Sequence, residues 1–208
     1  MRRKEFGIND REEIEAFLRE MEYGFLGTVD DAGQPRVTPL NFVYYNGNVY
    51  FHGSRIGEKM RSIAANPRVC FSVAKPFSQI PSYWIDPFLA CPATVFFKSV
   101  LITGTAEEVA DLAEKAEVFT ALMNKLQPEG GYSPIDPADE RYRKQLAGTA
   151  IVKIRVESMS AKFKFGQNWN DERRETITDR LLGRGHPLDE ETVRMIGRYC
   201  PVHRDENE

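Results

Sequence analysis

The turn Asn46-Gly47 is the feature that most constrains how this chain can fold. Asn-Gly between two alternating apolar segments predicts a two-residue β-hairpin, because both residues accept the positive φ that such a turn requires. The flanking segments, 36–45 and 49–52, have this alternation, and an earlier one runs from Tyr23 to the turn at 30–33. Consecutive strands joined by short turns predict an antiparallel meander.

The rest of the chain adds strands with few helices between them. Alternating or apolar segments at 68–74, 95–106 and 149–157 bring the expected strand count to about six or seven. Asp10 followed by Glu13 predicts a capped helix start, and apolar residues at helical spacing predict helices at 10–21, 55–65 and 112–126. Strands at this spacing favour a small barrel over a doubly wound sheet, so we expect a mainly β fold with flanking helices, an α+β fold.

Two further features bear on domain organisation. Segment 75–92 contains four prolines and four aromatic residues, and we expect a loop there, either a lid, a subunit contact or an ordinary packed surface loop. After Gly166 the chain turns helical. We therefore expect a barrel domain at 1–170 and a C-terminal helical extension at 171–208, packed on the barrel or on a partner.

Composition excludes several classes of function. The 208 residues have a net charge of −3, which gives no field to attract nucleic acid or anionic lipid. The chain has no apolar run long enough to span a bilayer, and its start lacks the apolar segment of a signal peptide. Three cysteines without a CxxC pair favour reduced thiols. We expect a cytoplasmic protein with no nucleic-acid partner, no membrane partner and no metal site.

The segment 49–59, VYFHGSRIGEK, carries the clearest chemical signal. A strand ends at Gly53-Ser54, and a segment of helical periodicity follows, with Arg55 and Lys59 four residues apart on its first turns. Free amides and the positive end of the helix dipole favour an anion, and two cations can add charge-assisted hydrogen bonds. The segment therefore predicts a phosphate cradle. On this segment alone, two solvated basic residues on a surface helix are an equally good interpretation.

Other nucleotide motifs are missing or incomplete. GxGxxG is absent, so a Rossmann site is unsupported, and Met60 stands where a P-loop requires Ser or Thr. His52 is the one histidine inside a predicted strand. Its place just before the cradle makes a chemical role and a structural role equally good interpretations.

Several short segments occur in an informative order. They are Pro39-Leu40-Asn41-Phe42, the YFHGS of 50–54, Gly57-Glu58-Lys59, Asn66-Pro67-Arg68-Val69, Ser99-Val100 before Gly104, and the FKFGQN of 163–168. Over roughly residues 1–170 this order resembles the FMN-binding split-barrel superfamily, which includes pyridoxamine 5'-phosphate oxidase. Within it the chain is most similar to the nitroimidazole-resistance reductase branch. The last segment is similar to one in the superfamily's flavin-binding negative transcriptional regulators.

The resemblance implies a six-stranded antiparallel split β-barrel with Greek-key-like connections. It also implies a homodimer with two FMN sites at the subunit interface. In this chain Arg55 and Lys59 would hold the FMN phosphate, and Ser54 would add a hydroxyl. His52 would lie near the ribityl chain or the ring, where it is our one candidate for a catalytic residue.

The resemblance also implies residues around the flavin ring. Those expected to line the isoalloxazine are Thr38, Pro39, Leu40 and Asn41; those reaching in from the other subunit are Lys98 and Ser99; those closing the far edge are Gln167, Asn168 and Trp169. Donors at the pyrimidine edge would stabilise the negative charge that grows on reduction, while the cofactor supplies the redox chemistry.

The function implied is an FMN-dependent oxidoreductase that reduces small aromatic or nitro compounds with electrons from a nicotinamide donor. Two alternatives stay open: a flavin- or haem-binding sensor or regulator with little turnover, and a barrel that has lost its cofactor. FMN is expected ahead of a deazaflavin or haem. The acidic end, CPVHRDENE, departs from the basic signature of the vitamin-B6 oxidases, which argues against pyridoxamine phosphate as substrate. The partners expected are a second copy of the chain and a small-molecule substrate.

Overall fold

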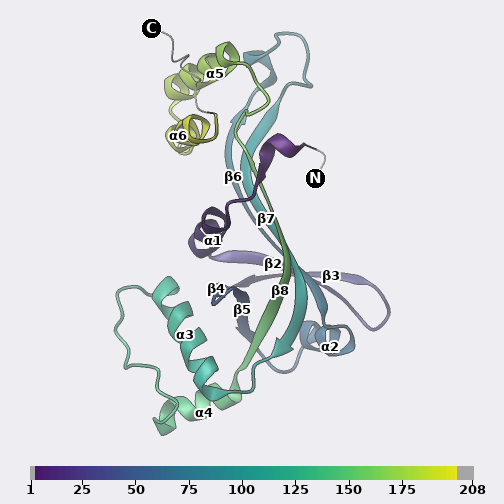
Figure 1. The fold of residues 1–208 in the computed structure, drawn as a ribbon, viewed down its shortest axis with the longest axis vertical. Helices are drawn as coiled ribbons and strands as arrows, with labels where there is room; N and C mark the ends of the chain where they lie inside the picture. The colour runs from purple at the N-terminus through teal and green to yellow at the C-terminus, as the bar shows by residue number, and fades with distance from the viewer. Residues whose placement is uncertain (1–2, 201–208) are drawn as a thin grey trace. The chain divides into compact units, whose positions relative to one another are not determined.

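The computed structural model describes residues 3–200, which form an α+β fold built on one antiparallel sheet (Figure 1). The strands of this part are β1 (Gly7–Ile8), β2 (Tyr23–Val29), β3 (Pro35–Asn41), β4 (Val43–Tyr45), β5 (Asn48–Gly53), β6 (Arg68–Ile80), β7 (Thr94–Glu108) and β8 (Ala150–Lys164). Its α-helices are α1 (Arg11–Glu20), α2 (Glu58–Ala65), α3 (Leu112–Leu126), α4 (Glu140–Gly148), α5 (Asp171–Arg184) and α6 (Asp189–Tyr199). The mainly β, α+β class predicted from the sequence is confirmed.

The sheet holds eight strands within the described residues, in the order β3-β2-β6-β7-β8-β5-β4, with β1 paired to β8. The sequence predicts six or seven strands. The additional strands come from the two-residue β1 and from a break in the expected strand at 36–45. Phe42 causes that break between β3 and β4, because its side chain is fully buried and contacts Phe71 edge-on, with the ring centroids 4.9 Å apart.

The hairpin predicted at Asn46-Gly47 is confirmed. Asn46 has φ 46° and Gly47 has φ 76°, and Tyr45 pairs with Asn48 across the turn. β5 then pairs with β8, with Phe51 opposite Val152. The turn therefore places β5 next to β8, which supplies many of the buried core residues.

The chain groups into two compact units that are interleaved in the sequence. The larger unit comprises residues 10–73 and 100–160, and the smaller unit comprises the described residues 3–9, 74–99 and 161–200. Strands β6, β7 and β8 contribute residues to both units.

The expected loop at 75–92 is partly a strand. β6 continues to Ile80, and the connection to β7 occupies only residues 81–93. Buried Phe77 and Ile80 anchor the end of β6 in the smaller unit, so packing extends the strand beyond the prolines' local preference. The prediction of a loop is therefore wrong for residues 75–80.

Helix α3 packs on the sheet of the larger unit. Its buried residues Val118 and Leu122 contact a cluster that includes Val43, Tyr50 and Ile151. The C-terminal end of α3 is held by Lys125, whose ammonium donates hydrogen bonds to the carbonyl oxygens of Met21 and, at 3.1 Å, of Phe42. The same ammonium lies 4.2 Å from the centroid of the Phe42 ring.

Burial lowers the pKa of Lys125 from 10.5 to about 8, and this shift makes the stability pH-dependent. Between these pH values the unfolded chain binds the Lys125 proton and the folded chain does not. The free energy of unfolding should therefore gain about 2 kcal/mol from this group as the pH rises from 8 to 10.5. Urea unfolding at several pH values should show this gain in the wild type and not in Lys125→Met. Parallel pH profiles for the two proteins would contradict the assignment.

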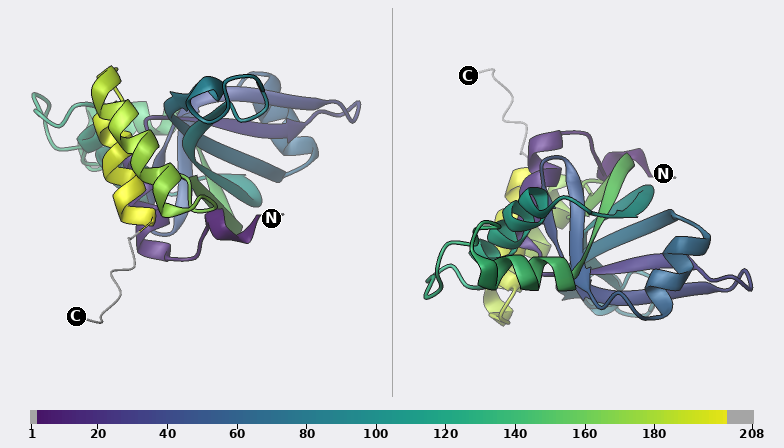
Figure 2. Two further views of the ribbon diagram at one scale, coloured as in Figure 1. Left: turned by 90° about the horizontal axis from the view of Figure 1, so that it is seen from above. Right: turned by 90° about the horizontal axis from the view of Figure 1, so that it is seen from below.

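In the smaller unit α5 and α6 lie side by side (Figure 2). Asp189, the first residue of α6, is 1% exposed and fixes this pair to β6. Its carboxylate accepts hydrogen bonds from Ser78 Oγ at 2.6 Å and from Arg184 Nη2 at 2.6 Å. Arg184 Nη1 in turn donates to the carbonyl oxygen of Gln79.

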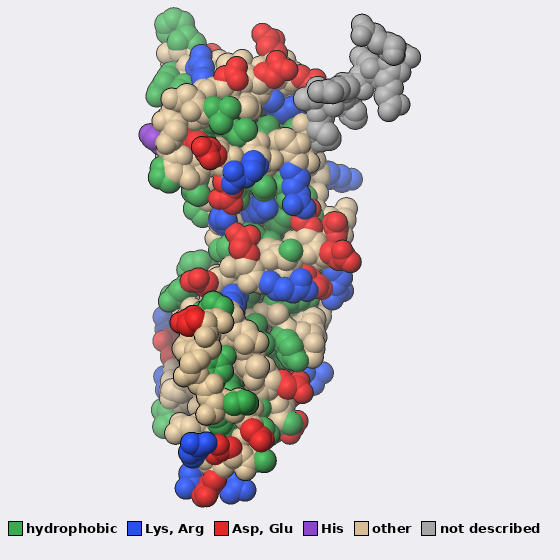
Figure 3. All heavy atoms as spheres, turned by 90° about the vertical axis from the view of Figure 1, so that its left-hand side faces the viewer, with side chains coloured by type: hydrophobic (Ala, Val, Ile, Leu, Met, Phe, Trp, Pro, Cys, Tyr) green, Lys and Arg blue, Asp and Glu red, His purple; other side chains and the backbone are tan. Residues whose placement is uncertain are grey.

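Basic and acidic side chains are interspersed on the face of the molecule drawn in Figure 3. Among residues 3–200, none of the helices combines the length and apolar character needed to cross a membrane. Large exposed apolar side chains occur at two notable places: Tyr23, Phe25 and Val37 on β2 and β3, and Tyr83, Phe88 and Leu89 in the connection 81–93.

Candidate cofactor site

The predicted phosphate cradle lies between β5 and α2 in the larger unit. β5 ends at Gly53 and α2 begins at Glu58, so Arg55 lies in the connecting turn. Only Lys59 is on the helix, and the prediction that both cations share its first turns is wrong. The reason is local: Ser54 Oγ accepts a hydrogen bond from the amide of Ile56 at 3.1 Å, which holds these residues in a turn.

The N-terminus of α2 has no side-chain cap. Asp10, Asp111, Asp139 and Asn170 cap α1, α3, α4 and α5 by accepting hydrogen bonds from the first amides of each helix. Gly57 occupies the same place before α2 and has no side chain that could do so. The first amides of α2 can therefore donate to an external anion.

The two predicted cations lie beside this helix end. Lys59 Nζ is 2.8 Å from the position that a Cβ atom on Gly53 would occupy, so the absence of a side chain there makes room for the ammonium. Arg55 Nε forms an ion pair with Glu108 Oε1 at 3.0 Å, and both side chains are well exposed. An exposed pair of this kind contributes roughly 0–1 kcal/mol, so an anion can compete for the guanidinium.

The acidic residue at the start of α2 is also paired. The Glu58 carboxylate forms an ion pair with Arg36 of β3, at 2.9 Å. Arg36 forms a second ion pair with Asp30, at 3.1 Å. Sequence reasoning missed Arg36, because it is 22 positions before Glu58 and only the arrangement of β3 beside α2 brings the two together. The contact partly neutralises the Glu58 carboxylate, which stands beside the cradle in the chain.

The four predicted ring-lining residues of β3 face two ways. Thr38 and Leu40 alternate with Pro39 and Asn41, so each pair occupies one face of the sheet. Pro39 pairs with exposed Phe25, which places the Pro39 and Asn41 pair on the exposed face. Only Thr38 and Leu40 share a face with Arg36.

His52 projects from β5 on the same face as Tyr50, which is the face that α3 covers. His52 is exposed to solvent on one side, and its ring lies 5.7 Å from the ring of Phe119, centroid to centroid. Partial burial, and secondarily the charge of Lys59, lower the pKa of His52 below its usual value. This lowering favours the neutral form of the ring, which can accept or donate a hydrogen bond.

Lys98 and Ser99, which were predicted to reach a flavin from the other subunit, make their side-chain contacts within the smaller unit. Lys98 is buried, and its ammonium lies over the rings of Phe77, Phe163 and Tyr199, at 5.1–5.9 Å from their centroids. Ser99 Oγ donates to the carbonyl oxygen of Lys162 at 3.5 Å.

Gln167 serves the turn that follows β8. Its Oε1 accepts from the amide of Phe165 at 2.8 Å, and its Nε2 donates to the carbonyl oxygen of Phe163 at 2.6 Å. These bonds occupy both ends of the amide group. Gln167 therefore stabilises the turn that precedes Asn168 and Trp169.

Asn168 and Trp169 line one cavity of the smaller unit, together with three cations that sequence reasoning missed: Arg3, Lys162 and Lys164. The available signal was the alternation of Lys162 and Lys164 in a strand, which puts both side chains on one face. Nothing in the sequence near Arg3 indicated that it would line this cavity, because the pairing of β1 with β8 brings the N-terminal segment to Lys162.

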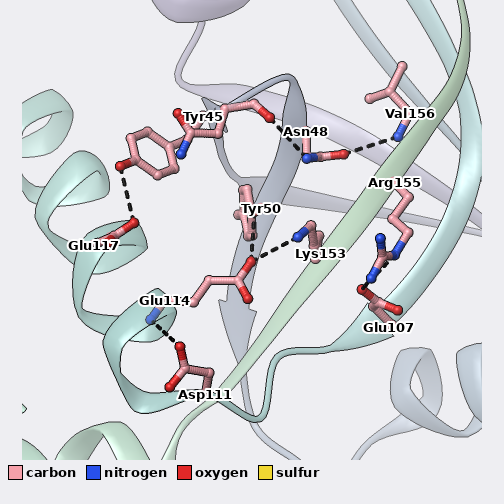
Figure 4. A network of polar contacts seen from close by, with 11 residues as sticks. Tyr45, Asn48, Tyr50, Glu107, Asp111, Glu114, Glu117, Lys153, Arg155 and Val156 are labelled. Carbon is pink, nitrogen blue, oxygen red and sulfur yellow. Dashed lines mark hydrogen bonds and ion pairs between the residues drawn. The ribbon is translucent and has the colours of Figure 1, made fainter.

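A polar network in the larger unit was also missed (Figure 4). Glu114 of α3 accepts hydrogen bonds from Tyr50 of β5 and from Lys153 of β8, both at 2.9 Å. The hydrogen bond from Lys153 is the main reason that the pKa of Glu114 is lowered, despite partial burial. The network joins α3 to two strands, and its three members are mutually satisfied, which indicates a structural role.

Residues 10–163 match the sequence model of a family described as pyridoxamine 5'-phosphate oxidase. A search of curated proteins gives no match.

Solved structures with the same fold include three informative ones. A protein assigned to 5-nitroimidazole antibiotic resistance, from Bacteroides thetaiotaomicron, is 25% identical, with a TM-score of 0.60 over 75% of this chain and 85% of that chain. A flavocytochrome from Azotobacter vinelandii is 25% identical, with a TM-score of 0.65 over 82% of this chain and 74% of that chain. An FAD and haem binding protein from Mycobacterium smegmatis is 21% identical, with a TM-score of 0.64 over 87% and 80%, and supports the fold alone.

Proposed function

Because the chain belongs to the pyridoxamine 5'-phosphate oxidase family, we propose that it is a flavin-binding oxidoreductase that holds FMN through Arg55 and Lys59. The substrates we assign to it are small aromatic or nitro compounds, with electrons from a nicotinamide donor. The observation that carries the proposal is the uncapped N-terminus of α2, with Lys59 beside Gly53 and an exposed arginine in the preceding turn. The similarity to a nitroimidazole-resistance protein at 25% identity supports the substrate class.

The residues present fit a phosphate ester. The first amides of α2 and two cations supply donors, and the Glu58 carboxylate is paired with Arg36. The half-buried side chains of Thr38 and Leu40 offer a neighbouring wall for a ring. When bound, FMN supplies the hydride and electron transfer, so the protein's part is to bind, orient and exclude water.

A homodimer belongs to the same proposal, since the family resemblance places its flavin sites at a subunit interface within a split barrel. Tyr23, Phe25 and Val37 are 56%, 46% and 69% exposed. Gly27 pairs with Val37 and Phe25 with Pro39, so these apolar residues share one face of β2 and β3. An exposed apolar face of a sheet favours burial against a second copy.

Val37→Arg should weaken self-association by roughly tenfold or more, because it places a charge in the centre of the apolar face. Leu126→Arg is the matched control, since Leu126 is 43% exposed on α3 and lies outside that face. Sedimentation velocity over a range of concentrations measures the effect. Equal dissociation constants for the two variants, or a monomeric wild type, would remove this face as the interface.

The function is tested on the purified protein, by titration with FMN followed by addition of NADH or NADPH and a nitroaromatic acceptor. Saturable binding, bleaching of the flavin absorbance by the nicotinamide and its return on addition of the acceptor are expected. A protein that binds neither FMN nor a deazaflavin contradicts the proposal.

The similarity to a flavocytochrome keeps a second candidate, a flavin- or haem-binding sensor or regulator with little turnover. The same titration separates the two. A flavin-loaded protein that neither NADH nor NADPH reduces would favour the sensor, and haem binding with a sharp Soret band would identify the second ligand.

A further inference from the structure

The smaller unit contains a cationic cavity with aromatic walls. The cavity has a volume of about 510 Å³, in the range of small-molecule sites. The lining residues that matter are Arg3, Lys162, Lys164, Phe6, Phe97 and Trp169. The Arg55 and Lys59 cradle contributes no residue to this lining.

The charge of the cavity is of one sign. Lys162 and Lys164 alternate along β8 and so share a face, and Arg3 joins them in the lining. Within residues 3–200 no carboxylate lines the cavity. Arg3 forms an ion pair with Glu5 at 3.4 Å, in which both side chains are more than a third exposed. Burial, followed by repulsion from Lys162 and Arg3, lowers the pKa of Lys164. A bound anion would relieve this repulsion.

The walls suit a planar ring. The ammonium of Lys162 lies 5.5 Å from the centroid of the Phe6 ring and 5.3 Å from that of Phe97. Gly166, with a φ of +89°, turns the chain beside Trp169, and a Cβ atom on Gly166 would lie only 2.9 Å from the indole, so the absence of a side chain makes room for the ring. These rings can stack on an aromatic ligand while the cations meet its charged group.

We propose that this cavity binds a planar aromatic anion, a ring system carrying a carboxylate, sulfonate or phosphate. Two sources share this chemistry: the flavin itself, and a separate small aromatic anion such as a substrate. Lys164, which donates a hydrogen bond to Thr94 Oγ1, is already oriented within the cavity. The proposal does not depend on the Arg55 and Lys59 assignment.

The probes are 1-anilinonaphthalene-8-sulfonate, an aromatic anion, and N-phenyl-1-naphthylamine, the same ring system without the sulfonate. Lys162→Gln combined with Lys164→Gln should weaken binding of the sulfonate at least about tenfold and leave the neutral amine within twofold. Arg180→Gln combined with Arg194→Gln is the matched control, since both residues are exposed cations of the same unit outside the cavity. Fluorescence titration of folded protein, checked by circular dichroism, gives the dissociation constants.

Equal weakening of both probes, or equal affinity of the sulfonate for the cavity and control variants, would overturn the proposal. Lys162→Arg combined with Lys164→Arg should restore the affinity, because the charge is kept. If the cavity double variant does not fold, the affinities of the two probes for the wild-type protein are compared at rising salt concentration. The affinity for the sulfonate must then fall, and the affinity for the neutral amine must not.

FMN competition identifies the source of the ligand. If FMN displaces the sulfonate probe from wild type, the flavin supplies the anion; if FMN-loaded protein still binds the probe, the site takes a separate aromatic anion. Arg55→Gln combined with Lys59→Gln should bind the probe as wild type does. Failure of the FMN proposal and failure of this one are therefore distinguishable.

Discussion

Arg55→Gln combined with Lys59→Gln is expected to weaken FMN binding by roughly 10²- to 10³-fold. Each charged hydrogen bond to a phosphate contributes about 1.5–3 kcal/mol, and the exposure of Arg55 favours the lower end, which gives about 3–4 kcal/mol for the pair. Arg55 lies in the turn before α2 and Lys59 in its first turn, so both cations are close in the chain to the uncapped amides of the helix. Isothermal titration of the apoprotein with FMN measures the change.

Riboflavin is the control ligand for this prediction, because it lacks the phosphate and should lose little affinity in the double variant. Arg61→Gln combined with Arg68→Gln is the control protein, since both arginines are exposed and lie on or just after α2. FMN affinity should also fall with salt in wild type more than in the double variant. If FMN and riboflavin weaken equally, the cradle does not hold the phosphate.

Asp189→Asn is expected to lower the free energy of unfolding by about 3–5 kcal/mol, since it leaves a largely buried charge without its partner. Arg184, with a side chain 18% exposed, donates two hydrogen bonds to the Asp189 carboxylate, from Nε at 2.8 Å and Nη2 at 2.6 Å. The amide of His186 donates a further one at 2.9 Å. Urea unfolding followed by circular dichroism gives the value.

Glu140→Gln is the comparison variant, because Glu140 pairs with Lys144 where both side chains are more than two-thirds exposed, and it should change stability little. Asp189→Leu combined with Arg184→Met should recover much of the lost stability, since no unpaired charge remains. A loss below 1 kcal/mol in Asp189→Asn would show that water reaches Arg184 and that the pair does not anchor α5 and α6.

The same pair predicts a pH dependence. Hydrogen bonds from Arg184, the largest influence, hold the pKa of Asp189 well below its usual 3.8. The contribution of Asp189 to the free energy of unfolding is therefore complete above the pKa that this residue has in the unfolded chain. It is lost as the pH falls below that pKa. Stability profiles of wild type and Asp189→Asn should accordingly converge in strong acid.

Local features of this protein could be predicted because they depend on neighbours in the chain. The Asn46-Gly47 hairpin and the Asp10 cap form through contacts within a few residues, and both occur as expected. The cradle at β5 and α2 was predicted from the same kind of signal. Its error, the placing of Arg55 on the helix, came from one side-chain hydrogen bond of Ser54 that competes with helix formation.

The amino-acid sequence by itself determined the antiparallel hairpins, the α+β class and the cationic turn before α2, because alternation, turn chemistry and capping act over a few residues. Only the tertiary structure decided that Arg36 neutralises Glu58, that Asp189 holds Ser78 from 111 positions away, and that Arg3 joins Lys162 and Lys164 around one cavity. These groups meet through strand pairing and helix docking. Pairing register and burial, which no short segment encodes, therefore set the charge of each site.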